Sequence, residues 1–178
     1  MTSLTYAFGA PDAECRYPVT TRGNYVGLVF RWHRAWFAIP AGITKADGTE
    51  HEIRVSSGST GKDAAAQYLC AEFDAGRIAP AQKAPEPGAP VSTTGALPLL
   101  HRRMDKPQNH KAAWAALRGL VALRWTPLGG YPGADNPWLL RCQLCGWTGI
   151  KYWSHLRGRN GNPPSPFRHP GCTGRKAI

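Results

Sequence analysis

The sequence RCQLCGW (residues 141–147) and the later RHPGC (residues 168–172) each place two metal-binding residue types three positions apart. Together they give the pattern C-x2-C-x23-H-x2-C, formed by Cys142, Cys145, His169 and Cys172. A gap of two residues lets both members of a pair turn toward one ion, and Gly146 permits the tight turn after the first pair. Three thiolates and one imidazole suit Zn²⁺, so we predict a tetrahedral structural zinc site.

Other cysteine and histidine residues leave alternatives to this ligand set. His155 could replace His169, because C-x2-C-x9-H is also a usable spacing, although His155 has no neighbour at ligand spacing. Cys15 and Cys70 lack such a neighbour too, and we expect Cys70 to be a small core residue on a helix. Disulfides are less expected than metal binding for five cysteines in a cytosolic chain.

The charge of the chain is concentrated in its C-terminal part. The 178 residues carry 22 Lys and Arg against 11 Asp and Glu, which gives a net charge of +11. Basic and acidic residues balance up to residue 100, and residues 136–178 contain seven basic residues and no acidic one. A surface that binds phosphates needs such a one-sided field, since each phosphate contact releases a counterion. We therefore favour a nucleic-acid partner over a role of the charge in solubility alone.

Composition excludes several classes of protein. No apolar run approaches the roughly 18 residues of a membrane span, and the N-terminus MTSLTYAFGA lacks the basic start and apolar core of a signal peptide. The hydrophobic content of 42% is too high for a wholly disordered chain. We expect a cytoplasmic protein without a membrane partner, and the Ala-, Gly- and Arg-rich usage is typical of a high-GC bacterium or its phage.

A proline-rich stretch divides the chain into two modules. Residues 80–98 (PAQKAPEPGAPVSTTGALP) contain five prolines and few large apolar residues, which predicts an extended linker. The linker separates a neutral module, residues 1–79, from a basic module, residues 99–178. We predict an α+β fold, in which a small three-stranded sheet and a helix precede the linker, and a helix and a zinc module follow it.

In the neutral module, β-branched and aromatic residues predict strands over 25–31 and 35–39, and polar–apolar alternation predicts a third over 51–55. A helix over 61–75 should follow, with Thr60 and Asp63 as a capping box and Gly76 directly after its end.

In the basic module, we expect a helix that begins near Asp105 and Pro107 and runs to about Trp125. The residues near one of its faces are Ala113, Leu117, Leu120, Val121 and Arg124, and Lys111 and Arg118 share another face. A short strand over 138–141 should lead into the first cysteine pair.

Residues 130–172 resemble small treble-clef zinc modules, which accompany phage and mobile-element nucleases and DNA-binding proteins. The features that match, in order, are Tyr131 and Gly133, the Cys142/Cys145 pair with Gly146, Leu156 followed by Gly158, and His169-Pro170-Gly171-Cys172. The chain departs from the family in having His at the first position of the last pair and an insertion over 160–166.

A weaker resemblance links residues 22–73 to the Apetala-type (ethylene-response-factor) DNA-binding domain, which also has three strands followed by a helix. In that family, Arg and Trp on the sheet face read the major groove. The resemblance implies the same role for Arg31, Arg34, Trp36 and Arg54. The alternative is a small α+β domain whose aromatic residues belong to a core or face a partner.

These observations predict a zinc-stabilised nucleic-acid-binding protein of regulatory or mobile-element type, with duplex DNA favoured over RNA. In the basic module the residues predicted to contact nucleic acid are Lys111, Arg118, Arg141, Lys151, Arg157, Arg159 and Arg168. Arg157 and Arg159 flank Gly158, which allows a phosphate to approach the backbone closely.

Two alternative functions stay open. His155, Asn162 and His169 follow the order of a His-Asn-His nuclease, whose fold is built on a related treble clef. The last 43 residues, however, contain no Asp or Glu to hold Mg²⁺, so we do not predict an enzyme. The second alternative is a protein-interaction adaptor, in which zinc stabilises the fold and tryptophans contact the partner.

Overall fold

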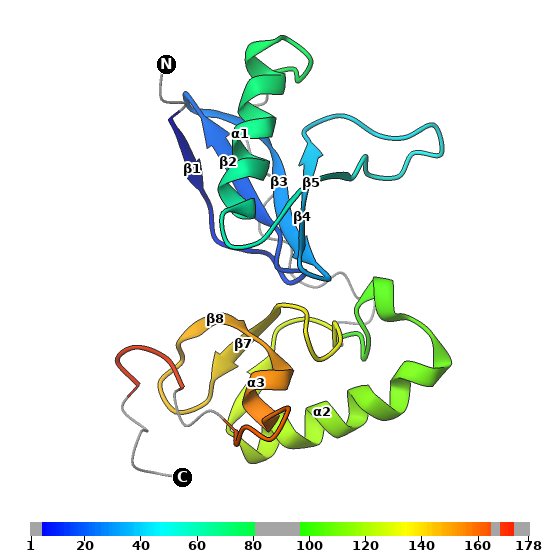
Figure 1. Cartoon of the computed structure of the whole chain (residues 1–178), viewed down its shortest axis with the longest axis vertical. Coiled ribbons are helices and arrows are strands. Elements are labelled where there is room, and N and C mark those ends of the chain that lie inside the picture. Colours follow the sequence, from blue (N-terminus) through cyan, green and yellow to red (C-terminus); the bar gives the residue numbers. More distant parts are fainter. Residues whose placement is uncertain (1–4, 81–96, 165–167, 173–178) are drawn as a thin grey trace. The chain divides into compact units, whose positions relative to one another are not determined.

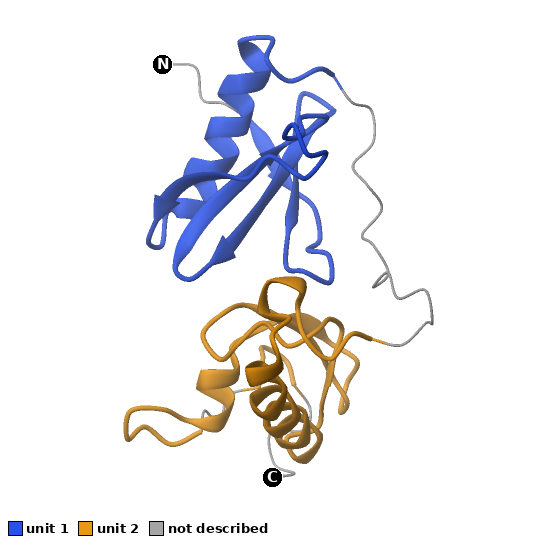
Figure 2. Cartoon of the chain, turned by 90° about the vertical axis from the view of Figure 1, so that its right-hand side faces the viewer, with its two compact units in different colours: residues 1–88 blue, residues 89–178 orange. Residues whose placement is uncertain are grey.

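A computed structural model describes residues 5–80, 97–164 and 168–172. These residues form two antiparallel sheets, of five and three strands, and three α-helices (Figure 1). The predicted α+β class is therefore confirmed. The chain divides into two compact units, Met1–Gly88 and Ala89–Ile178, named unit 1 and unit 2 below (Figure 2). Most of the predicted linker, 81–96 of residues 80–98, lies outside the described residues.

Unit 1 is an antiparallel sheet in which each strand pairs with the next in the sequence. Its strands are β1 (Tyr6–Phe8), β2 (Tyr17–Thr21), β3 (Asn24–Trp32), β4 (Ala35–Pro40) and β5 (Ile53–Ser57). The three predicted strands correspond to β3, β4 and β5, with β5 beginning and ending two residues later than expected. The prediction of only three strands is wrong, because β1 and β2 extend the sheet at the free edge of β3.

One face of this sheet is covered by the helix α1 (Gly61–Asp74), as Figure 1 shows. Leu69 of the helix is fully buried in one cluster with Val29 of the central strand. Leu28 and Phe30, the neighbours of Val29, belong to a second buried cluster. Because successive side chains of a strand point to opposite faces, both faces of the sheet are apolar. Unit 1 therefore builds its core from ordinary sheet and helix packing.

The start of α1 differs from the predicted capping box. Thr60 precedes the helix, but its side chain makes no capping hydrogen bond. The Asp63 carboxylate accepts a hydrogen bond of 2.8 Å from the hydroxyl of Tyr6, a residue of the unpredicted edge strand β1. At the other end Gly76 has a φ of +71°, a left-handed conformation that Gly adopts readily after a helix.

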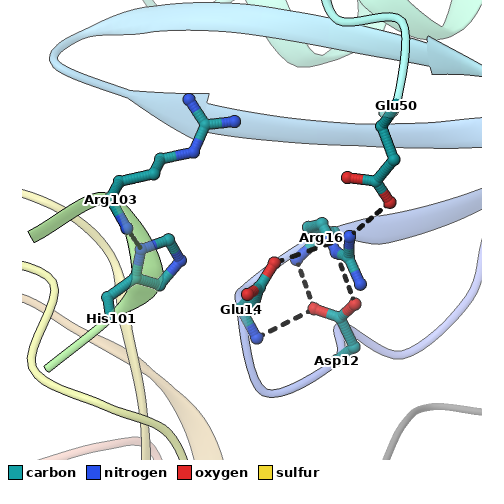
Figure 3. Close-up of polar contacts among 6 residues, drawn as sticks. All are labelled: Asp12, Glu14, Arg16, Glu50, His101 and Arg103. Atoms are coloured by element: carbon teal, nitrogen blue, oxygen red, sulfur yellow. Dashed lines mark hydrogen bonds and ion pairs between the residues drawn. The ribbon is translucent and has the colours of Figure 1, made fainter. Parts of the chain in front are cut away.

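An ion-pair cluster joins the loop before β2 to the loop before β5 (Figure 3). The Arg16 guanidinium lies 2.7 Å from the Asp12 carboxylate, 2.8 Å from that of Glu50 and 3.5 Å from that of Glu14. Asp12 also accepts hydrogen bonds from the backbone N–H groups of Glu14 and Arg16. Three carboxylates surround one cation, so this part of unit 1 is unsuited to binding phosphate.

Unit 2 contains the smaller sheet and the two remaining helices. Its elements are the short 3-10 turns η1 (Arg102–Met104) and η2 (Pro107–Asn109), the helices α2 (His110–Ala122) and α3 (Trp153–Arg157), and the strands β6 (Trp125–Pro127), β7 (Trp138–Cys142) and β8 (Thr148–Lys151). Strand β7 pairs with both β6 and β8. The His101 ring caps η1 by accepting a hydrogen bond of 3.2 Å from the backbone N–H of Arg103 (Figure 3).

Helix α2 begins and ends inside the predicted range. Asp105 does not cap it, because η2 intervenes and α2 starts at His110. Arg124 adopts a φ of +57°, so the helix ends before Trp125, which starts β6. The buried face consists of Ala113, Ala116 and Leu120.

The small residues of α2 determine which side faces the core. Ala113 and Ala116 let the helix backbone approach the sheet closely, and Trp153 packs against Gly119, where a methyl group would overlap its ring. Val121, predicted to lie near the same face as the buried Leu120, is 68% exposed. Among the described residues, no helix combines the length and the apolar character needed to cross a bilayer.

Candidate metal centre

Cys142, Cys145, His169 and Cys172 lie together and could hold a metal ion. One potential ligand atom from each residue lies within 4.8 Å of all the others. The Sγ atoms of Cys142 and Cys172 are 4.0 Å apart, and Sγ of Cys145 is 3.2 Å from Nε2 of His169. A Zn–S distance of about 2.3 Å places two sulfurs of a tetrahedron about 3.8 Å apart, so the spacing suits such a site.

Two glycine-containing turns present the ligands. In the first, Cys142 ends β7, its carbonyl accepts from the Gly146 N–H at 2.9 Å, and Gly146 has a φ of +78°. In the second, the Cys172 N–H donates to the His169 carbonyl at 3.4 Å, and Gly171 has a φ of +71°. Both pairs thus turn back within one tight loop, which explains why a spacing of two residues suffices.

The ring of His169 is held in the orientation that metal binding needs. Its Nδ1 lies 2.9 Å from the Pro170 carbonyl, and a proton donated there leaves the lone pair of Nε2 directed toward the sulfur of Cys145. The indole of Trp147 stacks on the imidazole, with ring centres 4.5 Å apart and planes 5° from parallel. His169 is 2% exposed, so packing fixes it as well as hydrogen bonding.

His155, the alternative histidine ligand, lies outside this group. It is exposed on α3, and its ring lies beside that of Tyr152, with centres 5.3 Å apart. Within the described ranges, the four residues above are the only group of three or more potential ligands.

Arg168 supports the metal centre from inside the fold. Its side chain donates to the carbonyls of Leu123 and Arg124 at 2.7 and 2.9 Å and to Sγ of Cys142 at 3.4 Å. The guanidinium also lies over the Trp125 ring, 4.5 Å from its centre. Arg168 is only 4% exposed, so it is not placed to contact phosphate as the sequence suggested. The carbonyls at the end of α2 need donors, and Arg168 supplies them.

Positive groups balance the charge of the sulfurs. Three thiolates and a divalent ion carry a net charge of −1, which Arg168 and the half-buried Lys151 can offset. Burial alone would raise the pKa of Cys142, but hydrogen bonds from Arg168, the Leu144 backbone and its neighbouring ligands outweigh burial and lower it. Burial and the nearby Arg168 lower the pKa of Lys151, whose Nζ lies 5.5 Å from the centre of the Trp147 ring.

The other predicted basic residues of unit 2 differ in their surroundings. The exposed ones are Lys111 and Arg118 on α2, Arg141 on β7, Arg157 at the end of α3, and Arg159. Arg159 forms an ion pair of 2.7 Å with Asp135, one of two acidic residues in unit 2. Its charge is therefore partly neutralised.

The residues predicted from the Apetala-type resemblance do not share one face in unit 1. Arg31 pairs with Trp36 across β3 and β4, and Trp36 packs on Gly61 at the start of α1, so both lie on the helix side. Arg54 pairs with Phe37, which belongs to the cluster on the opposite face. Arg34 lies in the turn between β3 and β4. The sheet of unit 1 therefore does not present these four side chains as one surface.

No protein-family model matches the chain, and neither a curated protein nor a solved structure shows significant similarity to it. A function must therefore be argued from the metal centre and from the distribution of charge around it.

Proposed function

We propose that unit 2 is a zinc-stabilised nucleic-acid-binding module of the treble-clef type, with duplex DNA as its partner. The observation that carries the proposal is a compact Cys₃His group in a unit of strongly one-sided charge. Residues 89–178 hold 13 of the 22 Lys and Arg but only two of the 11 Asp and Glu. The charge attracts a polyanion, and the metal gives the charged segment a fixed shape.

The donor set supports zinc as the ion. Three sulfurs and one imidazole nitrogen are typical of closed structural zinc sites, whereas Mg²⁺ and Ca²⁺ prefer oxygen ligands. The site would contribute to folding, because it joins β7 to the segment 168–172, which contributes Arg168 and Cys172 to the interior of unit 2. The ion would thus act through structure rather than through chemistry on a substrate.

Exposed cations on unit 2 provide the contacts to the backbone of the nucleic acid. Arg141 lies on the strand that ends in Cys142, and Arg157 ends the helix that follows β8. Lys111 and Arg118 lie on α2. A metal that fixes β7 and its neighbours would hold these cations at constant separations, which favours binding to a regular array of phosphates.

The test is binding of the full chain to a duplex of about 20 base pairs across a salt series. We expect the affinity to fall steeply between 50 and 200 mM salt, on the order of 10³-fold for six phosphate contacts. Removal of the metal by a chelator should abolish binding, and addition of Zn²⁺ should restore it. Binding that is insensitive to salt or to the chelator would contradict the proposal.

The same preparation separates the two alternatives considered from the sequence. Nicking of the duplex on addition of Mg²⁺ or Mn²⁺ would favour a nuclease. Binding to heparin without binding to duplex DNA, together with weak salt dependence, would favour an adaptor for an acidic protein.

A further inference from the structure

We propose that α2 is the recognition helix of this module and that its outer face enters the major groove of duplex DNA. The inference rests on the proposed function and adds to it the element that reads the bases. The outer face is defined here by Lys111, Trp114, Arg118 and Val121, which follow one another at helical spacings of three, four and three residues.

The outer face lies away from the side that packs on the core. Ala113, Ala116 and Leu120 are fully buried, whereas Trp114 is 54% exposed and Val121 68% exposed. With Leu97, these two are the only large apolar side chains exposed in the described parts of the chain. Trp114 and Val121 lie seven residues apart on one face of the helix with Arg118 between them, and an exposed apolar patch with charged neighbours supports a binding role.

The shape of α2 suits a groove. Its 13 residues span about 20 Å, and the side chains next to the four outer residues include the small, exposed Ala112, Ala115 and Ala122. A slim helix of this kind fits the major groove, which is about 12 Å wide. Trp114 is the one aromatic side chain on the outer face, so it would be the residue that reaches the floor of the groove.

The chemistry of the outer face matches the groove as well. Lys111 and Arg118 are seven residues, or about 10 Å, apart on the helix, and can contact phosphates or guanine edges on either side of Trp114. Trp114 and Val121 offer apolar contacts to thymine methyl groups. The sequence of α2, HKAAWAALRGLVA, contains no acidic residue that a phosphate would repel.

The other helical and sheet surfaces are less suited to this role. The helix α3 has only five residues, too few to follow a groove, and the sheet of unit 1 divides its predicted DNA-contacting residues between two faces. Unit 1 also has no net charge, with nine basic and nine acidic residues in 1–88. The same residues could also bind a single strand, with an unpaired base stacked on Trp114. The experiment below separates this mode from binding in the major groove.

The experiment starts by selecting preferred duplexes from a random pool with the zinc-loaded full chain. Affinity is then measured for a selected duplex, for the same duplex with uracil in place of thymine, for a random duplex and for a single strand. The variants are Trp114→Ala and Lys111→Gln, and the matched control is Lys45→Gln, which removes one exposed positive charge from unit 1. Zinc stoichiometry and circular dichroism verify that each variant is folded.

We expect Trp114→Ala to lose about 5- to 100-fold in affinity for the selected duplex and little for the random one. Uracil substitution should weaken binding of the wild type more than binding of this variant, which keeps only the contact from Val121. Lys111→Gln should weaken binding to both duplexes and reduce the salt slope by about one, whereas Lys45→Gln should leave the slope unchanged.

Three results would overturn the inference, and they are distinguishable. If Trp114→Ala binds both duplexes as the wild type does, α2 is not the recognition helix, although the proposed function stands. If the loss is larger on the single strand than on the duplex, Trp114 stacks on an unpaired base instead. If the wild type binds no duplex at all, the proposed function fails and this inference fails with it.

Discussion

The two units of this chain differ in their cores and in their charge. Unit 1 buries apolar side chains on both faces of a five-stranded sheet, and its charges balance. Unit 2 has a small sheet of short strands, carries the entire net charge, and places a Cys₃His group where β7 meets the segment 168–172.

Under the proposed function, this difference explains why unit 2 would need a metal ion and unit 1 would not. Like charges destabilise a compact state through mutual repulsion, and this repulsion acts in unit 2 but not in the neutral unit 1. Under the proposed function, a metal that joins β7 to the segment 168–172 would offset this repulsion and let unit 2 keep its charge. Unit 1 is neutral and has no such repulsion to offset.

The largest effect should come from Cys172→Ser, which removes one metal ligand from unit 2. Structural zinc contributes about 10 kcal/mol or more to the folding of small zinc domains, which exceeds the stability of many whole domains. We expect the amide NMR signals of unit 2 to collapse to unfolded positions while those of unit 1 stay dispersed. The control is Cys70→Ala, which alters a buried cysteine of unit 1 and should keep one bound ion. If both units stay folded in Cys172→Ser, unit 2 does not depend on the metal for its folding.

A substitution in the core of unit 1 should destabilise unit 1 and leave unit 2 and its metal content unchanged. Leu69 is fully buried between α1 and the sheet, so Leu69→Ala should lower the free energy of unfolding of unit 1 by about 2–5 kcal/mol. Urea titration followed by NMR measures this loss, and the zinc content should not change. Ala71→Ser, on the exposed side of the same helix, should cost less than about 1 kcal/mol. Metal loss from Leu69→Ala would show that the units do not fold independently.

Arg168→Met tests the support of the metal centre without changing a ligand. Loss of its hydrogen bonds to Cys142 and to the end of α2 should weaken zinc binding about 10- to 100-fold, measured by competition with a chelator. Burial alone raises the pKa of Cys142 and Arg168 opposes it, so without the guanidinium this pKa should rise. Because the ligand must be deprotonated, half-release of the metal should then occur at a higher pH.

The matched variant for this experiment is Arg157→Met, which removes an exposed arginine eleven positions earlier. It should leave both the zinc affinity and the pH of half-release unchanged. Equal behaviour of the two variants would mean that Arg168 does not support the site.

The smallest effect is expected from Asp135→Asn, which breaks the exposed ion pair with Arg159. Exposed pairs contribute less than about 1 kcal/mol, so the melting temperature of unit 2 should hardly move. Under the proposed function, the released Arg159 should tighten duplex binding a few-fold. Asp105→Asn removes the same charge elsewhere in unit 2, so the difference between the two variants measures Arg159 itself. A variant that binds no better than Asp105→Asn would exclude Arg159 from the interface.

The sequence predicted the elements that carry a strong local pattern. Strands β3 and β4 are rich in β-branched and aromatic residues, and α1 ends at Asp74, one residue before the predicted end and two before the left-handed Gly76. The four potential metal ligands come together in two pairs, and each pair is fixed by its own short turn. Tertiary structure is needed only to bring the two turns next to each other.

The features that sequence reasoning missed depend on distant contacts. Pro18 obscured β2, although a strand near a sheet edge tolerates a proline, and three-residue β1 is too short to show a pattern. The face that α2 buries contains Ala113, Ala116 and Leu120, whereas the sequence pattern grouped Val121 with Leu120.

The role of Arg168 was equally hidden in the sequence, since a basic residue beside a metal ligand looks like a surface cation. Only the fold brings the carbonyls at the end of α2, more than 40 positions away, within its reach.

The parallel stacking of Trp147 on His169 has a practical consequence for following this protein in solution. An indole in contact with a ligand ring makes the intrinsic fluorescence of Trp147 sensitive to the state of the cluster. The unpaired electrons of Co²⁺ quench nearby fluorophores, and its d–d bands absorb visible light. We therefore expect the fluorescence of Trp147 to decrease when Co²⁺ replaces a diamagnetic ion at the cluster. Loading and release could therefore be timed in a stopped-flow instrument without attaching a dye.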